Sequence, residues 1–456
     1  MRAQPLIVGA GPAGIRAAAT LVAAGLRPVV VDEAPASGGQ IYRQPLVPDG
    51  RDARARYGSE AAKAERLHGE FAGLADRIDY HPGALVWNVS PGVADVVVHG
   101  ETRRIVHDGM ILATGAADRV LPIPGWTIPG VFTLGGAQIA LKAQGAAIGQ
   151  RVVFLGSGPL LYLVAWQYMK AGVTVAGVLD CAPFSAKFAL LRALPHQPRA
   201  VLLGLKYVAD LRLAGVPIRF GVEAPAILGE ARVTGIEWRE DDQRHHLSCD
   251  GIGYGLGLRS ETQLADLAGC AFAFSSRDRA HVAVRDAAGR SSVAGVYLAG
   301  DGAGIMGADA AELAGERAAL ALIEDRALPG NPARAAALES ELLRHSRFRD
   351  AMEAAFPFPH HWEIADETIL CRCEEITARA ARAAIGQFSL TEINRLKAVS
   401  RIGMGRCQGR VCGAGAAELL AHEAGRDIAT VGRLRGQAPV KPIPLALVAE
   451  TREAAE

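Results

Sequence analysis

Short apolar runs and longer helix-like patterns alternate along most of the chain. Residues 6–8 and 29–31 are runs of Leu, Ile and Val typical of buried strands, and residues 12–24 between them have the apolar spacing of a helix. The same order recurs from residue 152, where an apolar run, a glycine turn and a helical stretch precede another run at 173–179. Repeats of strand, helix and strand predict an α/β fold with parallel sheets.

The later part of the chain returns to the pattern of its beginning. A strand is predicted at residues 296–299 and an Ala-rich helix at 308–324, followed by a boundary with Pro and Gly at 327–335. We therefore expect a split first domain interrupted by a second one, then a partly helical linker and a small, mostly α domain. The predicted ranges are 1–120 plus 251–326, 121–250, 327–365 and 366–456.

Composition and charge narrow the functional classes. The net charge is +1 with both signs interspersed, so nothing indicates binding to nucleic acid or to an anionic membrane. Two uncharged stretches, 120–141 and 152–169, contain prolines and glycines that a spanning helix tolerates poorly, and we expect no transmembrane segment. A cytoplasmic location is expected, with peripheral attachment to a membrane through an electron acceptor as an alternative.

The first βαβ unit carries a dinucleotide-binding turn. Gly9 allows the tight turn, Gly11 lets a pyrophosphate approach the backbone, and Gly14 lets the helix pack close to the strand. The helix that begins at Pro12 and Ala13 points its positive end at the phosphates. Asp32 ends the second strand and is the predicted ligand of the ribose hydroxyls, with Glu33 as a substitute.

Three further motifs distinguish FAD from NAD at this turn. They are Gly38-Gly39-Gln40 after the acid, Ala113-Thr114-Gly115 at a strand end, and Gly300-Asp301 near the end of the split domain. Together they resemble the glutathione-reductase-like FAD superfamily. That resemblance implies that Asp301 hydrogen-bonds the flavin ribityl chain. It also implies that the helix after Gly304 points its N-terminus at the flavin pyrimidine edge.

A second motif of the same kind departs from the pattern. Gly156 and Gly158 follow a strand and open a helix, and Asp180 ends the next strand, but Leu161 stands where the third glycine belongs. A leucine there pushes helix from strand and disturbs pyrophosphate binding. The inserted domain is therefore expected to turn over NAD(H) poorly, and a structural role or another nucleotide remain open.

Four of the seven cysteines lie in pairs near the C-terminal end. Cys371 and Cys373 form one pair and Cys407 and Cys412 the other, and four thiolates on two loops suit a [2Fe–2S] cluster. Zinc is the alternative, although zinc sites usually have Cys-x₂-Cys spacing. Between the pairs, Thr377 is predicted to cap a helix, and Ser389 with Glu392 to form a capping box for the next. The isolated cysteines Cys181, Cys249 and Cys270 are expected to be buried and inert.

The cysteine segment resembles the bacterioferritin-associated-ferredoxin type of [2Fe–2S] domain, with a longer second spacing. Over nearly its whole length the chain resembles the α subunit of heteromeric opine oxidases, hydrogen cyanide synthase and proline or hydroxyproline dehydrogenases. The resemblance rests on residues 32–35, 38–43, 155–161 and 441–445 and on the cysteine set. It implies a partner β subunit that is similar to D-amino-acid oxidase and holds its own FAD, and it allows a small third subunit.

These features predict an electron relay. A flavin accepts two electrons and an iron–sulfur cluster passes them singly, so a chain with both converts two-electron chemistry into single-electron flow. The family resemblance implies that the electrons come from oxidation of an amine on the partner subunit and go to a downstream acceptor. No substrate-binding acid, base or arginine set is recognisable near the flavin motifs, so the catalytic residues stay unknown. The alternative is a self-sufficient NAD(P)H-dependent ferredoxin-type reductase.

Overall fold

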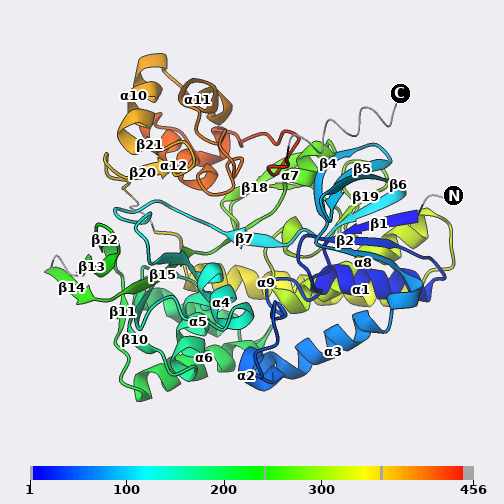
Figure 1. The fold of residues 1–456 in the computed structure, drawn as a ribbon, viewed down its shortest axis with the longest axis horizontal. Coiled ribbons are helices and arrows are strands. Elements are labelled where there is room, and N and C mark those ends of the chain that lie inside the picture. The colour runs from blue at the N-terminus through cyan, green and yellow to red at the C-terminus, as the bar shows by residue number, and fades with distance from the viewer. Residues whose placement is uncertain (1–3, 241–242, 360–362, 445–456) are drawn as a thin grey trace. The chain divides into compact units, whose positions relative to one another are not determined.

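The computed structural model describes residues 4–240, 243–359 and 363–444, and its contacts divide the chain into two compact units (Figure 1). The first unit comprises residues 1–117, 259–344 and 435–456, and the second comprises residues 118–258 and 345–434. The α/β class predicted from the apolar pattern is confirmed, because both units are built on sheets with parallel strands flanked by helices.

The first unit contains a seven-stranded sheet that includes the strands predicted at residues 6–8, 29–31 and 296–299. Its order is β3-β2-β1-β6-β5-β4, with β19 also on β6. Pairs among β1, β2, β3, β6 and β19 are parallel, whereas β4, β5 and β6 form an antiparallel meander. The bounds are β1 Gln4–Val8, β2 Val29–Asp32, β3 Asp79–Pro82, β4 Leu85–Ser90, β5 Val93–Val98, β6 Glu101–Leu112 and β19 Val296–Leu298.

Helices α1 (Pro12–Ala23) and α8 (Ala308–Asp325) lie side by side in this unit (Figure 1). Both are rich in alanine, which lets their backbones approach closely. A Cβ atom added at Gly315 of α8 would lie 2.0 Å from the carbonyl oxygen of Ala13, so only glycine fits there. The contact joins the start of the chain to the segment that returns after the insertion. Remaining elements are α2 Ala53–Tyr57, α3 Ala61–Ala72, α7 Gln263–Leu267, β7 Ala116–Asp118, β16 Leu258–Ser260, β17 Phe272–Ser275 and β18 Ala280–Ala283.

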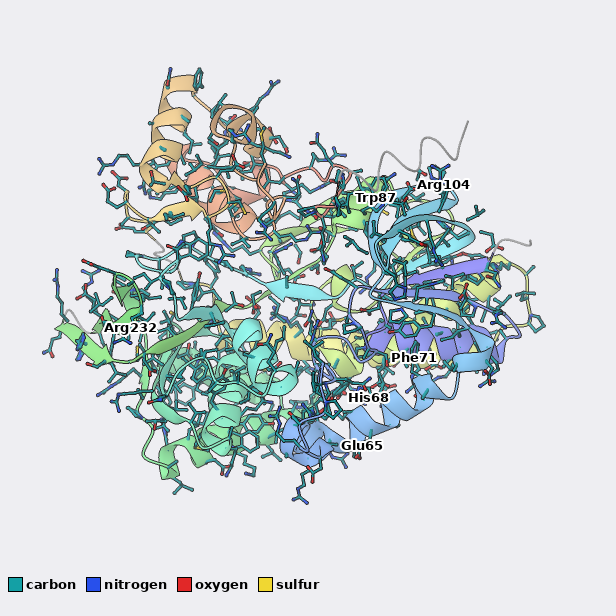
Figure 2. All side chains as sticks on the ribbon, viewed as in Figure 1. Glu65, His68, Phe71, Trp87, Arg104 and Arg232 are labelled. Atoms are coloured by element: carbon teal, nitrogen blue, oxygen red, sulfur yellow. The ribbon has the colours of Figure 1, made fainter. Side chains whose placement is uncertain are left out.

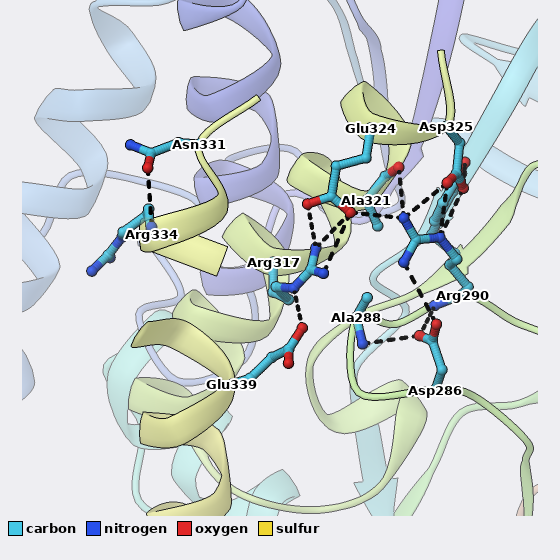
Figure 3. Close-up of polar contacts among 11 residues, drawn as sticks. Asp286, Ala288, Arg290, Arg317, Ala321, Glu324, Asp325, Asn331, Arg334 and Glu339 are labelled. Atoms are coloured by element: carbon cyan, nitrogen blue, oxygen red, sulfur yellow. Dashed lines mark hydrogen bonds and ion pairs between the residues drawn. The ribbon is translucent and has the colours of Figure 1, made fainter. Parts of the chain in front are cut away.

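The predicted linker begins as a helix that is docked on the first unit. Helix α9 (Pro332–Ala355) follows the boundary at residue 327, and the division between the units falls within it, after Arg344. Arg317 of α8 donates to Glu339 of α9 at 2.8 Å and also pairs with Glu324, as Figure 3 shows. The first half of the linker is therefore fixed by ion pairs.

The second unit contains a five-stranded, all-parallel sheet of order β11-β10-β9-β15-β8. Strand β15, Gly251–Leu256, is buried throughout and pairs with β9, so it belongs to this sheet, whereas the sequence placed residues from 251 onward in the first domain. Its apolar residues give no sign of which sheet they join. The other bounds are β8 Val131–Thr133, α4 Leu134–Ala143, β9 Arg151–Ser157, α5 Pro159–Lys170, β10 Thr174–Asp180, α6 Pro198–Leu213, β11 Ile218–Phe220, β12 Glu223–Gly229, β13 Val233–Glu240 and β14 Gln243–Ser248.

The cysteine segment of the second unit is mostly helical, as predicted. It contains β20 (Ile369–Cys371), β21 (Ile376–Thr377), α10 (Ala378–Phe388), α11 (Ile393–Ser400) and α12 (Gly413–Glu423). Thr377 caps α10 by accepting from the Ala380 amide, as the sequence predicted. The predicted capping box is wrong: Ser389 ends α10 in the left-handed conformation, and Glu392 itself caps α11 through the Asn394 and Arg395 amides.

Candidate functional site

The first glycine turn has the close approaches that its motif predicts. Gly9 has a φ of +108°, and a Cβ atom there would lie 2.3 Å from the Ala113 carbonyl oxygen. At Gly14 an added Cβ would lie 1.7 Å from the Gly9 carbonyl oxygen. Only glycine fits either position, so strand and helix meet at the separation that a dinucleotide turn needs.

The acid at the end of β2, Asp32, lies against this turn. The Asp32 carboxylate accepts hydrogen bonds from the Ala10 amide at 2.5 Å and from the Ala34 amide at 2.6 Å. Burial raises the pKa of Asp32, while these amides oppose the shift. Glu33 instead forms an ion pair with Lys441, so of the two acids only Asp32 is bonded to the turn.

The Gly-Gly segment after the acid also reaches the turn. The Gly38 amide donates to the Ala10 carbonyl at 2.8 Å, and a Cβ atom at Gly39 would lie 2.9 Å from the Gly11 Cα. His68 of α3, labelled in Figure 2, bonds the Tyr42 carbonyl at 2.9 Å and holds the far end of this loop. Gln40 is exposed.

The other two predicted FAD motifs meet on the same side of the sheet. The Thr114 hydroxyl donates to the Glu261 carbonyl at 2.6 Å, and a Cβ atom at Gly302 would lie 2.7 Å from that hydroxyl oxygen. Asp301 accepts from the Met306 and Gly307 amides, directly before α8. The structure therefore brings together the three motifs that the sequence could only name separately.

Two residues that support this arrangement were missed by sequence reasoning. The Ser260 hydroxyl donates to the Asp301 carbonyl at 2.6 Å and accepts from the Gly304 amide. The Glu261 amide donates to the Gly115 carbonyl at 2.9 Å. Both residues lie outside any recognisable motif, and their roles depend on contacts across more than forty positions of sequence.

The second glycine turn keeps both of its first two glycines, but the acid that follows it is already bonded to other side chains. Leu161 is fully buried in the apolar core between β9 and the helices. Asp180 is also fully buried, and its carboxylate accepts from the Tyr162 hydroxyl at 2.6 Å and pairs with Lys187 at 2.7 Å. The Lys187 ammonium lies 3.8 Å from the ring centre of Phe356. The acid that would bind a second ribose is thus already bonded to protein groups.

The four predicted ligand cysteines lie together. The Cys412 thiol is hydrogen-bonded to Cys371 and to Cys407, and Cys407 is bonded in turn to Cys373. Hydrogen bonding from Cys412 lowers the pKa of Cys371 to about 6 and that of Cys407 to about 4, while the same bonds raise the pKa of Cys412. Burial raises the pKa of Cys373.

Backbone amides surround two of these sulfurs. The Cys371 sulfur accepts from the Gly403 and Glu374 amides, and the Cys407 sulfur from the Val411 and Gly409 amides. At Gly405 an added Cβ atom would lie 2.3 Å from the Cys373 Cβ, so the glycine lets the two loops meet. Among the residues with described placement, no group of three or more His, Cys, Asp or Glu side chains has the arrangement of a metal site. The observation at this position is the proximity of the four thiols, two of which have lowered pKa values.

The cysteine loop is fixed to its own unit by an indole. The Trp126 Nε1 donates to the Ile369 carbonyl at 2.6 Å, two residues before Cys371. The Arg372 guanidinium lies 5.8 Å from the ring centre of the same tryptophan. Cys181, Cys249 and Cys270 are buried apart from this cluster, and burial raises the pKa of each thiol, as expected for inert cysteines.

This geometry defines a flavoprotein-type oxidoreductase core followed by a cysteine-rich domain. The profile of the pyridine nucleotide-disulphide oxidoreductase family matches residues 3–315, and that of the sarcosine oxidase A3 domain matches residues 366–452. The chain belongs to the family that contains opine oxidase subunits and the hydrogen cyanide synthase subunit HcnB. The resemblance predicted from the motifs is thereby confirmed.

Similarity extends over nearly the whole chain. An opine oxidase subunit of Rhizobium meliloti is 40% identical over 98% of this chain and 87% of its own length. Hydrogen cyanide synthase subunit HcnB of Pseudomonas protegens is 33% identical over 97% of each chain. The crystal structure of L-proline dehydrogenase from P. horikoshii superposes with a TM-score of 0.72 at 19% identity, over 98% of this chain and 79% of that one, which shows the shared fold.

Proposed function

We propose that this chain is the electron-relay subunit of a heteromeric amine dehydrogenase, acting on an opine, a proline-type or a related amino acid. The observation that carries the proposal is the contact among four thiols in a domain that follows a flavoprotein core. The names of the relatives support it, since they describe subunits of opine oxidase, hydrogen cyanide synthase and sarcosine oxidase.

The residues around the first glycine turn are proposed to hold FAD. Gly11 and the α1 N-terminus would receive the pyrophosphate, Asp32 the adenosine ribose, and Asp301 the ribityl chain. Bound FAD would supply two-electron chemistry. Further proposed contacts are Gly9, Pro12, Ala13, Gly14, Glu33, Gly39, Gln40, Ala113, Thr114, Gly115 and Gly300.

Cys371, Cys373, Cys407 and Cys412 are proposed to hold a [2Fe–2S] cluster that passes electrons singly. The amides at Gly403 and Gly409 would hydrogen-bond the ligand sulfurs, which favours their thiolate form. Arg372 next to the ligands would offset part of the negative charge. The amine would be oxidised on a D-amino-acid-oxidase-like β subunit with its own FAD, with a small third subunit as an option, and this chain would deliver the electrons to an external acceptor.

Metal analysis of anaerobically purified protein tests this proposal. About two iron and two acid-labile sulfide per chain are expected, with the electron paramagnetic resonance signal of a reduced [2Fe–2S] centre. A Cys→Ser substitution at any of the four positions should abolish the signal, while Cys249→Ala, at a buried cysteine outside the group, should keep it. If the protein contained stoichiometric zinc and no iron, the four cysteines would form a structural zinc site, and the proposed electron-relay function would be wrong.

The alternative, a self-sufficient NAD(P)H-dependent reductase, has less support. A nicotinamide dinucleotide at the second turn would need a free ribose acid, whereas Asp180 is bonded to Tyr162 and Lys187. Gly156 and Gly158 keep the backbone of the turn, so a different nucleotide at this position stays part of the proposal. No helix among the described segments is long and apolar enough to cross a membrane, and a cytoplasmic location is likewise proposed.

A further inference from the structure

Two neighbouring segments of the second unit expose large apolar side chains. They are the 3₁₀ helix η3, Phe184–Arg192, and helix α6, Pro198–Leu213. The exposed side chains, each more than half accessible, are Phe184, Phe188, Leu191, Leu202, Leu205 and Leu213. Leu190 of the first segment packs in one small cluster with Val201 of the second, and exposed apolar side chains on neighbouring segments mark an interaction site more often than single scattered ones do.

Helix α6 exposes leucines on the side that faces away from its buried residues. Val201, Tyr207 and Leu211 are buried and face inward, and Tyr207 packs 4.8 Å from Trp166 of α5 between ring centres. One helical step away, Leu202 and Leu205 are 60% and 51% exposed. A surface helix normally turns polar residues outward, whereas the outer side of α6 mixes these leucines with Arg199, Lys206 and Arg212.

The phenylalanines of η3 extend this apolar surface. Phe184 and Phe188 make an edge-on ring contact at 6.1 Å, and Phe184 also contacts Phe220 at 5.2 Å. Even so, 57% and 67% of these two residues is exposed. The rings are therefore ordered against each other with their outer surface open, as anchors of a protein interface are.

The charges around the apolar side chains have one sign. Arg192, Arg199, Lys206 and Arg212 are all exposed, and the single acid among residues 184–213 is Asp210. Asp210 is already bonded to Lys206 at 2.6 Å and to the Trp166 indole at 2.8 Å. This surface is basic although the chain as a whole carries a charge of only +1.

We propose that residues 184–213 form the docking surface for the companion subunit, through a complementary apolar face rimmed with Asp and Glu. The inference rests on the proposed function, which requires a companion. A second copy of this chain fits poorly, because an isologous contact would bring Arg192, Arg199 and Arg212 of both copies together, while Lys206 is already paired with Asp210. Aromatic and leucine side chains within a rim of arginines are the usual anatomy of a heteromeric contact.

The test measures association of the purified companion subunit with variants of the full chain. Two double variants are compared with the wild type. The apolar variant, Phe188→Ser with Leu205→Ser, and the charge variant, Arg199→Glu with Arg212→Glu, should each weaken binding about tenfold or more. The charge variant should also slow association at low salt. Val106→Ser/Leu343→Ser removes equally exposed apolar side chains from the first unit and should leave binding unchanged. The flavin spectrum and thermal midpoint of each variant report whether it is folded.

Each other outcome has a defined meaning. Unchanged binding by both surface variants would overturn this inference and leave the proposed function standing. The same holds if the substitutions instead convert a homodimer of this chain into monomers. It also holds if the wild-type complex binds vesicles of phosphatidylcholine with phosphatidylglycerol and the variant complexes do not. A wild-type chain that forms no complex with any companion subunit would overturn the proposed function, and the inference with it.

Discussion

Two aspartates at equivalent places in two glycine motifs have different surroundings. Asp32 accepts hydrogen bonds from two backbone amides, that of Ala10 in the turn and that of Ala34 two residues further on. Asp180 is bonded to the side chains of Tyr162 and Lys187 and is wholly buried. An acid needs free lone pairs to bind ribose hydroxyls, so the first site is the better candidate for a dinucleotide.

We predict that Gly11→Ala weakens FAD binding about tenfold or more without unfolding the protein. An added Cβ would lie 3.5 Å from the Gly39 Cα, an ordinary contact, but it would occupy space that the pyrophosphate needs. The measurement is FAD retention by absorbance, with the thermal midpoint as a check. Gly69→Ala, on α3 with open space at its Cβ, is the control. If Gly11→Ala retained as much FAD as the wild type, the pyrophosphate would have to bind at another position.

We predict that Lys187→Met lowers the free energy of unfolding by about 3 kcal/mol at neutral pH, because it leaves the buried Asp180 carboxylate unpaired. Burial already raises the pKa of Asp180, and Lys187 opposes that shift. Without the lysine the pKa rises further, so the deficit should shrink as the pH falls toward about 4 and the carboxyl is protonated.

Urea unfolding at several pH values measures this effect. Lys206→Met removes an exposed lysine paired with Asp210 and should cost much less stability than Lys187→Met, because solvent screens an exposed ion pair. Lys187→Met/Asp180→Asn should recover part of the loss, since it removes the unpaired charge. A deficit in Lys187→Met that does not depend on pH would mean that packing, not the ion pair, makes the lysine important.

At the scale of elements, the start of α11 shows where local patterns mislead. The Ser-x-x-Glu spacing at 389–392 matches a capping box, but Ser389 is needed at the C-terminal end of α10, with a φ of +48°. Helix α11 therefore begins later, and Glu392 supplies the capping oxygen. Two helix ends share the four residues 389–392, and a motif that describes one helix end does not take the other end into account.

We predict that Glu392→Ala lowers the stability of the cysteine domain by about 1 kcal/mol, because two amides at the start of α11 lose their acceptor. Ser389→Gly should be neutral or slightly stabilising, since glycine adopts the left-handed conformation without strain. Thermal unfolding of both variants measures the difference. A larger loss of stability in Ser389→Gly than in Glu392→Ala would support the capping box instead.

The sequence was sufficient for elements whose signal is local. Strands at 6–8 and 29–31, the helix between them, and α8 follow from apolar spacing and glycine placement. The sheet to which β15 belongs could not be predicted, because a strand that is buried throughout has no polar side to indicate its partner. Tertiary pairing with β9 decides it.

The candidate sites divide in the same way. The glycine turn and the cysteine spacing could be predicted because chemistry fixes the residue types within a few positions. The engagement of Asp180 could not, since its partners Tyr162 and Lys187 belong to no recognisable motif. The basic surface around Leu205 was also missed, because charges averaged over the whole chain nearly cancel.

At the scale of the whole molecule, the reductant that the flavin accepts distinguishes an amine-dehydrogenase subunit from an NAD(P)H-dependent reductase. We predict that NADH alone reduces the flavin slowly or not at all, because Asp180 is engaged and Leu161 replaces the third glycine of the second turn. The proposed complex with its companion subunit should be reduced rapidly by a secondary amine such as an opine or proline. Anaerobic rapid mixing followed by flavin absorbance compares the two reductants on the same preparation. The cysteine-to-serine variants should keep amine-driven flavin reduction and lose transfer to a one-electron acceptor, since the thiols lie in a different unit from the proposed FAD residues. Reduction by NADH at turnover rates, with no response to amines, would reverse the assignment in favour of a reductase.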